Sequence, residues 1–187
     1  GDQWRLDDLH ARFAGADILV SATISNATAV RDWEFLKGRS ATPDARWPER
    51  LQRLADTLES ISFAAPPELR LVFEGDARNL QSFNARFNLN AAQADTPWGQ
   101  AETINFTSRL FAAATNELSR VEITLNAASA QTRWANTTNL NLQLRLLSLV
   151  THPDLVDCTA TLRANAAATP WATVGQTQLK ARWVHAV

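Results

Sequence analysis

The chain has 187 residues, 45% of them hydrophobic and 20% charged, a balance that supports a folded core and argues against wholesale disorder. Its net charge of -1 argues against a dedicated nucleic-acid binder, because such proteins carry a marked excess of basic residues. One cysteine excludes an internal disulfide, and one cysteine with three scattered histidines cannot form a metal cluster.

The N-terminal third of the chain predicts a hairpin and then a helix. Segments 6–15 and 17–27 alternate apolar and polar residues and are expected to pair as two antiparallel strands. From about residue 48 to 61, leucine, alanine and isoleucine recur at helical spacing, and Pro48 suits the first helical turn. Pro66 and Pro67 prevent the helix from continuing, so we expect it to be an insertion between strands.

The remainder of the chain predicts long strands with one apolar and one polar face each. Apolar residues recur with period two, and the alternate positions hold Asn, Gln, Thr, Arg and Glu. Alanine pairs such as Ala127–Ala128 are expected to mark a bend or bulge, because the apolar phase changes beyond them. The residues expected to line the apolar face are Phe83, Phe87, Leu89, Ile104, Phe106, Leu110, Val121, Ile123, Leu125, Leu140, Leu142, Leu144, Val156 and Leu162.

Tryptophan marks an internal repeat. Trp98, Trp134 and Trp171 lie 36 and 37 residues apart, and each stands two positions after a threonine. The three indoles are interpreted as structural pegs that pack repeat against repeat, with a platform that stacks on sugars as the alternative. Each repeat is expected to be one long hairpin. The predicted fold class is therefore mainly β, a long antiparallel meander of about 36-residue hairpins forming a strongly curved, groove-like sheet with the helix at about 48–61 inserted.

The chain is expected to be a single repeat-built β domain over residues 1–187. An irregular first repeat covers 1–46, the helix insertion covers 47–62, and the regular repeats cover 63–187. Because the chain lacks methionine and begins at Gly1, we expect it to be a fragment of a longer protein.

Candidate catalytic residues are isolated from one another. Asp7 and Asp8 are consecutive strand residues and are expected to point to opposite faces, which argues against a shared acid–base role. His152 is expected in a solvated turn, and Cys158 on the apolar side of a strand. No nucleotide-binding, serine-hydrolase or zinc-protease motif occurs. We therefore expect no enzyme, no cofactor and no metal site.

Three stretches carry a family resemblance. They are A-x-T-P-W-G-x-A-E-x-I-x-F-T-x-R-L (Ala94–Leu110), T-P-W-A-T-V-G-Q-T-Q-L-K-A-R-W (Thr169–Trp183) and the opening Leu6–Ala27. These units resemble repeats of AsmA-like and TamB-like envelope proteins, part of the repeating β-groove, bridge-like lipid-transfer superfamily. The resemblance implies a trough-shaped sheet that holds acyl chains inside and leaves headgroups outside. It also implies a periplasmic location in a diderm bacterium, with an inner-membrane anchor elsewhere in the full-length protein and a role in outer membrane biogenesis.

The extent of the apolar face is the main functional observation. One helix of 14 residues covers about two or three strands, whereas the pattern predicts about eight or more. The sheet must therefore fold over on itself or bind something apolar.

The expected function is a non-catalytic segment of an envelope protein whose apolar groove binds or conducts lipid acyl chains between membranes. The expected partners are phospholipid or another acyl lipid and other envelope proteins, without nucleic acid and with membrane contact only outside this segment. Two alternatives remain: a structural or protein-interaction β-module in envelope assembly, and a carbohydrate-binding β-sandwich.

Overall fold

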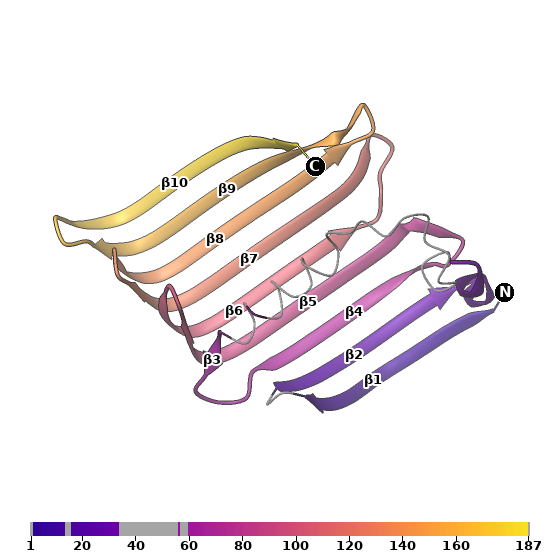
Figure 1. Cartoon of the computed structure of the whole chain (residues 1–187), viewed down its shortest axis with the longest axis horizontal. Helices are drawn as coiled ribbons and strands as arrows, with labels where there is room; N and C mark the ends of the chain where they lie inside the picture. Colours follow the sequence, from indigo (N-terminus) through magenta and orange to yellow (C-terminus); the bar gives the residue numbers. More distant parts are fainter. Residues whose placement is uncertain (1, 14–15, 34–55, 57–59, 187) are drawn as a thin grey trace.

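A computed structural model of the chain describes residues 2–13, 16–33, 56 and 60–186. The described strands form one open, curled sheet of ten strands (Figure 1). The elements in chain order are β1 (Gln3–Phe13), β2 (Ala16–Ser25), the 3-10 helix η1 (Ala27–Asp32), β3 (Ser62–Phe63), β4 (Glu68–Asp76), β5 (Asn79–Thr96), β6 (Gly99–Phe111), β7 (Glu117–Thr132), β8 (Asn136–Leu149), β9 (His152–Ala168) and β10 (Thr173–Ala186).

The strands follow one another across the sheet in the order β1-β2-β4-β5-β6-β7-β8-β9-β10, and β3 pairs with β5. From β4 to β10 every neighbouring pair is antiparallel, which confirms the predicted groove-like meander of hairpins. The difference is the pair β2–β4, which is parallel. β4 begins beside the start of β2, at the pair Asp17↔Glu68, and therefore runs in the same direction.

The first two strands form the predicted hairpin, pairing from Gln3↔Ser25 to Phe13↔Ala16. The helix η1, which the sequence pattern did not predict, follows β2. The indole Nε1 of Trp33 donates to the Ala77 carbonyl at 2.8 Å and ties this segment to the β4–β5 turn. The helix predicted at about 48–61 lies almost wholly outside the described residues.

Three hairpin turns share a hydrogen-bond pattern centred on a threonine hydroxyl. In the β7–β8 turn, the Thr132 hydroxyl donates to the Ala135 carbonyl at 3.0 Å. It accepts from the amides of Trp134 and Ala135 at 3.2 and 3.0 Å. Thr169 makes the same three bonds in the β9–β10 turn, and Thr96 makes two of them in the β5–β6 turn. The repeated threonine therefore closes the turn that joins the two strands of each repeat.

Each repeat also contains one residue with a left-handed backbone inside its second strand. Thr103 in β6, Asn139 in β8 and Gln176 in β10 have φ of 51°, 50° and 45°, a region that non-glycine residues rarely occupy. Each stands five residues after the turn tryptophan of its repeat, and the pairing keeps one register on both sides. We call the line of these three residues across the sheet the crease.

The apolar phase of β5 and β7, the first strands of two repeats, changes beside the crease. In β5 the buried residues Ala91 and Ala94 are three positions apart, where an extended strand would place them two apart. In β7 the buried Ala127 is followed by the exposed Ala128 and the half-buried Ala130. The burial of β5 and β7 thus changes phase near the predicted alanine pairs, but the bulge expected as one possible cause is absent there, because the pairing keeps one register across both sites.

The buried core of the described residues consists of small side chains. Its apolar members are Ala16, Ala22, Ala27, Ala77, Ala91, Ala94, Ala127, Cys158 and Ala164. Among the residues the structure describes, no large side chain is fully buried. All described strands belong to one sheet, so this part of the chain lacks the second stacked sheet of a β-sandwich.

Candidate functional site

One face of the sheet carries three rows of side chains that are apolar at every position except Ser108, and the strand registers align these rows from β1 to β10. We call it the apolar face. The first row is Ala11, Ile18, Leu69, Leu89, Phe106, Leu125, Leu142, Leu162 and Leu179. The second row is Leu9, Val20, Leu71, Phe87, Ser108, Ile123, Leu144, Ala160 and Ala181. The third row is Leu6, Ala22, Phe73, Ala85, Leu110, Val121, Leu146, Cys158 and Trp183.

Ten of the fourteen residues expected on the apolar face lie in these three rows. Ile104 and Leu140 lie beside the crease, where they pair with Ala91 and Ala127. Val156 lies near the opposite end of β9. The structure thus aligns ten of the predicted residues on one face, and their role in binding lipid stays a prediction.

Phe83 differs from the other members of the set because it belongs to a local cluster. Its ring covers Gly75, where an added Cβ would lie 2.5 Å from the ring carbon Cγ. The Trp33 ring packs against it edge-on, with centroids 5.9 Å apart. Phe83 therefore contributes to packing at the η1 end of the sheet rather than to the open rows.

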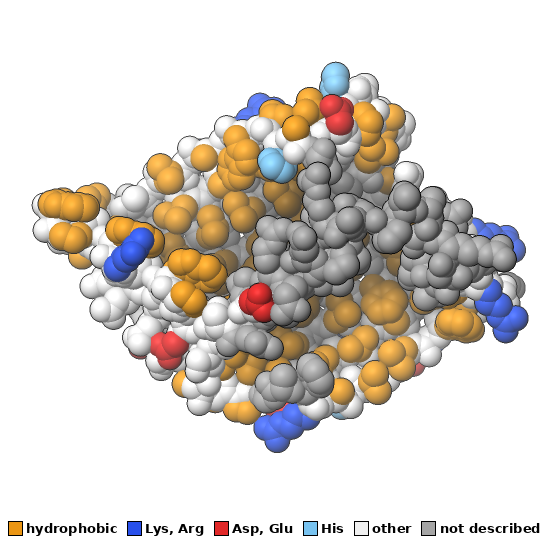
Figure 2. Space-filling view, in the orientation of Figure 1, with side chains coloured by type: hydrophobic (Ala, Val, Ile, Leu, Met, Phe, Trp, Pro, Cys, Tyr) orange, Lys and Arg blue, Asp and Glu red, His pale blue; other side chains and the backbone are white. Residues whose placement is uncertain are grey.

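The side chains of the apolar face shield one another but are not sealed from solvent. Those in the central strands are half-buried, and the Leu110 side chain is 38% exposed. The Phe87 and Phe106 rings meet edge to face, with centroids 6.0 Å apart. Toward the sheet edges exposure rises to 50% at Leu9 and 62% at Leu179. Figure 2 shows hydrophobic side chains gathered over β7, β8 and β9, with charged groups mostly at the margins.

The opposite, polar face is held by cross-strand side-chain hydrogen bonds. The Asn105 amide donates to the Asn90 side-chain carbonyl at 2.6 Å, and Asn141 donates to Asn126 at 2.7 Å. These asparagines sit directly opposite one another in their ladders. Side chains that satisfy one another in this way suit a face that stays in water.

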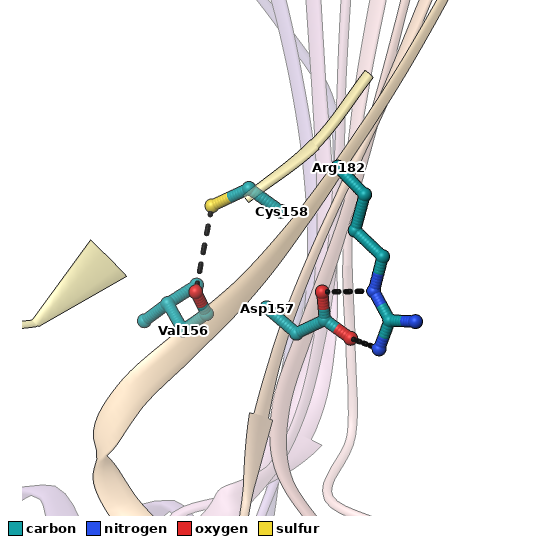
Figure 3. A network of polar contacts seen from close by, with 4 residues as sticks. All are labelled: Val156, Asp157, Cys158 and Arg182. Atoms are coloured by element: carbon teal, nitrogen blue, oxygen red, sulfur yellow. Dashed lines mark hydrogen bonds and ion pairs between the residues drawn. The ribbon is translucent and has the colours of Figure 1, made fainter. Parts of the chain in front are cut away.

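Figure 3 shows how β9 separates the two faces at consecutive residues. Asp157 accepts from Nε and Nη2 of Arg182 at 3.0 and 2.7 Å, on the polar side. The guanidinium holds the pKa of Asp157 below its ordinary value, and the carboxylate raises the pKa of Arg182. Cys158 leaves the strand on the other side, is 4% exposed, and donates from Sγ to the Val156 carbonyl at 3.6 Å. It behaves as the small buried hydrophobe that the sequence predicted.

The remaining catalytic candidates are also placed. The expectation that Asp7 and Asp8 point to opposite faces is wrong, because the β1–β2 register shifts there and Asp8 has φ of 51°. Asp7 accepts from Arg5 Nε at 2.8 Å and Asp8 from Ser21 Oγ at 2.9 Å, both on the polar face. His152 is the first residue of β9 rather than part of a turn.

A hollow of about 740 Å³ lies on the polar face near the β1–β2 end. Its charged lining is balanced, since Arg12 and Arg70 face Asp17 and Glu68, and Arg12 is 3.4 Å from Asp17. Within residues 2–13, 16–33, 56 and 60–186, no group of three or more His, Cys, Asp or Glu side chains is placed to hold a metal ion. No helix among these residues is long and apolar enough to cross a membrane.

The three repeat tryptophans lie in the turns at one end of the sheet. The exposed fractions of Trp98, Trp134 and Trp171 are 56%, 50% and 85%, and the Arg133 guanidinium lies 4.1 Å from the Trp134 ring centroid. We call these three residues the tryptophan rim. The threonine hydroxyls close the turns, and the role of the indoles as packing pegs stays a prediction.

Comparison with models of protein families, with curated proteins and with solved structures finds no match for this chain.

Proposed function

We propose that this chain is a non-catalytic segment of an envelope protein that binds lipid acyl chains on its apolar face and conducts them along the sheet. The observation that carries the proposal is the continuity of the three apolar rows from β1 to β10, combined with the partial exposure of their large side chains. An exposed apolar surface of this extent is typical of a binding site rather than of a solvated surface.

Desolvation supplies the driving force for such binding. Each methylene group that leaves water and is fully buried contributes about 0.8 kcal/mol, so an acyl chain covered by the face gains several kcal/mol. The first row holds aliphatic and aromatic side chains on every strand except the short β3. Because no polar group interrupts it, no contact fixes one position of the chain, and the lipid can slide from strand to strand.

The setting we propose is the periplasm of a diderm bacterium, with phospholipid or another acyl lipid as ligand. The support for this setting is the resemblance of the repeat units at Ala94–Leu110 and Thr169–Trp183 to AsmA-like and TamB-like envelope proteins.

A pair of matched double variants tests the proposal. Leu125 and Leu142 are cross-strand neighbours on the apolar face, and Thr124 and Gln143 are cross-strand neighbours on the polar face. Leu125→Asp with Leu142→Asp should lower binding of a fluorescent fatty acid and of co-purified phospholipid at least about tenfold, because charges on the face oppose desolvation of the chain. Thr124→Asp with Gln143→Asp adds the same charges one residue away and should leave binding unchanged.

Native mass spectrometry of the unaltered protein provides the decisive control. A lipid-free protein that also fails to bind the fatty acid would contradict the proposal. A stable oligomer that excludes the fatty acid would favour the protein-interaction module instead.

A further inference from the structure

The tryptophan rim is a second surface that the apolar face does not account for. The turns β5–β6, β7–β8 and β9–β10 lie at the same end of the sheet (Figure 1). Each is separated from the next by two strands, so the turns recur about every 10 Å along that end. Three indoles, all half exposed or more, therefore stand in a line at the tips of the sheet.

The residues beside each indole are mostly apolar or small. The tips are Thr-Pro-Trp-Gly at 96–99, Thr-Arg-Trp-Ala at 132–135 and Thr-Pro-Trp-Ala at 169–172. Pro97 and Pro170 are exposed with their tryptophans, and the one charged neighbour, Arg133, stacks on the Trp134 ring. The threonine hydroxyl common to all tips is committed to hydrogen bonds within the turn.

We propose that the tryptophan rim is a docking surface for the interface of a lipid bilayer. The indole combines a large apolar ring with one N–H donor and prefers the boundary between hydrocarbon and water. A line of such rings on turn tips can enter a flat headgroup layer together, and Arg133 adds a cation that favours anionic lipids. This gives the segment a membrane contact of its own, which the sequence pattern did not lead us to expect.

The tips fit a bilayer better than a sugar polymer. A sugar-binding aromatic platform needs polar groups beside each ring to read the hydroxyls. At the rim the position before the indole is Pro, Arg and Pro, and the position after it is Gly, Ala and Ala. The repeat therefore supplies a ring at each tip without a recurring hydrogen-bonding side chain that is free to bind.

Vesicle flotation tests this proposal. The unaltered protein should float with vesicles of phosphatidylcholine containing phosphatidylglycerol, and less with phosphatidylcholine alone. Trp98→Ala, Trp134→Ala and Trp171→Ala combined should lower the bound fraction about tenfold, because membrane affinity scales with the apolar area inserted. The matched control combines Leu80→Ala with Val150→Ala, which removes side chains 58% and 53% exposed at the opposite end of the sheet, and it should bind normally.

A second measurement does not depend on substitution. Brominated lipids should quench part of the tryptophan fluorescence of the unaltered protein. The triple variant should show no such quenching, because it lacks the three indoles of the rim. The proposal fails if the unaltered protein does not float, if the triple variant floats as well as the unaltered protein, or if the rim instead retains the protein on an insoluble polysaccharide. Binding of a monomeric fatty acid reports on the apolar face alone, so failure at the rim leaves the proposed function standing.

Discussion

The crease makes a prediction about backbone strain at Thr103. This residue is exposed in the middle of β6 and has φ of 51°. The left-handed region costs an ordinary L-residue about 1–2 kcal/mol, and a β-branched residue is among the least tolerant of it. Glycine adopts this region without steric penalty, so Thr103→Gly should release the strain.

The net effect follows from two opposing terms. Replacing a strand residue with glycine lowers the stability of the protein by about 0.5–1 kcal/mol, because glycine gives the unfolded chain more conformational freedom. Subtracting this from the released strain leaves the Thr103→Gly variant more stable by roughly 0.5–1 kcal/mol. Thr159 is an exposed threonine in β9 whose φ is not positive, so it has no left-handed strain to release. Thr159→Gly should therefore lose about 1 kcal/mol of stability, from the greater freedom of glycine in the unfolded chain.

Urea unfolding followed by far-UV circular dichroism measures both variants. The unfolding midpoint should rise for Thr103→Gly and fall for Thr159→Gly, with an unchanged dependence on urea concentration. If Thr103→Gly lowers the midpoint as much as Thr159→Gly does, the backbone at the crease is not strained and the reasoning is wrong.

Three further predictions concern the turns and the charged groups. Thr132→Val should destabilise the protein by about 1–2 kcal/mol, because it removes the hydroxyl that closes the β7–β8 turn. Thr132→Ser keeps the hydroxyl and should keep most of the stability. Both are measured as urea midpoints, and an equal loss in the two variants would show that the hydroxyl does not stabilise the turn. Gly99→Ala should lower the urea midpoint strongly, because the added Cβ would clash with the Gln131 backbone carbonyl oxygen; an unchanged midpoint would refute that clash. Hydrogen bonds from the Arg78 amide and the Asn26 side chain lower the pKa of Asp76 from its ordinary 3.8. The ionised Asp76 side chain therefore stabilises the fold above pH 3.8, and this stabilisation is lost as the pH falls through the lower folded pKa. When urea midpoints are measured at decreasing pH, the midpoint of Asp76→Asn should fall less in acid than that of the unaltered protein. An equal fall would contradict this.

The sequence predicted the fold wherever local patterning decides the structure. Period-two alternation identified the strands and their apolar sides, because a slip of one residue would expose a whole row such as that containing Leu125 and Leu142. The recurrence of Trp98, Trp134 and Trp171 identified the hairpin unit, and the alanine pairs identified the change of phase.

Other features depend on contacts or backbone conformations that local patterns do not encode. The parallel β2–β4 pair depends on the end of β2 beside which the next strand begins, and no alternation within the strands reveals this. The left-handed backbone at Thr103 runs against the preference of a β-branched residue. The turn threonines recur in the Thr-x-Trp spacing, but that spacing does not reveal that their hydroxyls bond to the turn backbone. For Asp7 and Asp8, the bulge overrode the alternation on which the prediction rested.

Photo-crosslinking of a fatty acid that carries a diazirine near the end of its chain tests the central claim most directly. The adducts, mapped by peptide mass spectrometry, should fall on the apolar rows, including Leu125, Leu142 and Leu144. Adducts on the polar-face residues Thr124 and Gln143, or labelling no stronger than that by a water-soluble diazirine, would contradict the account.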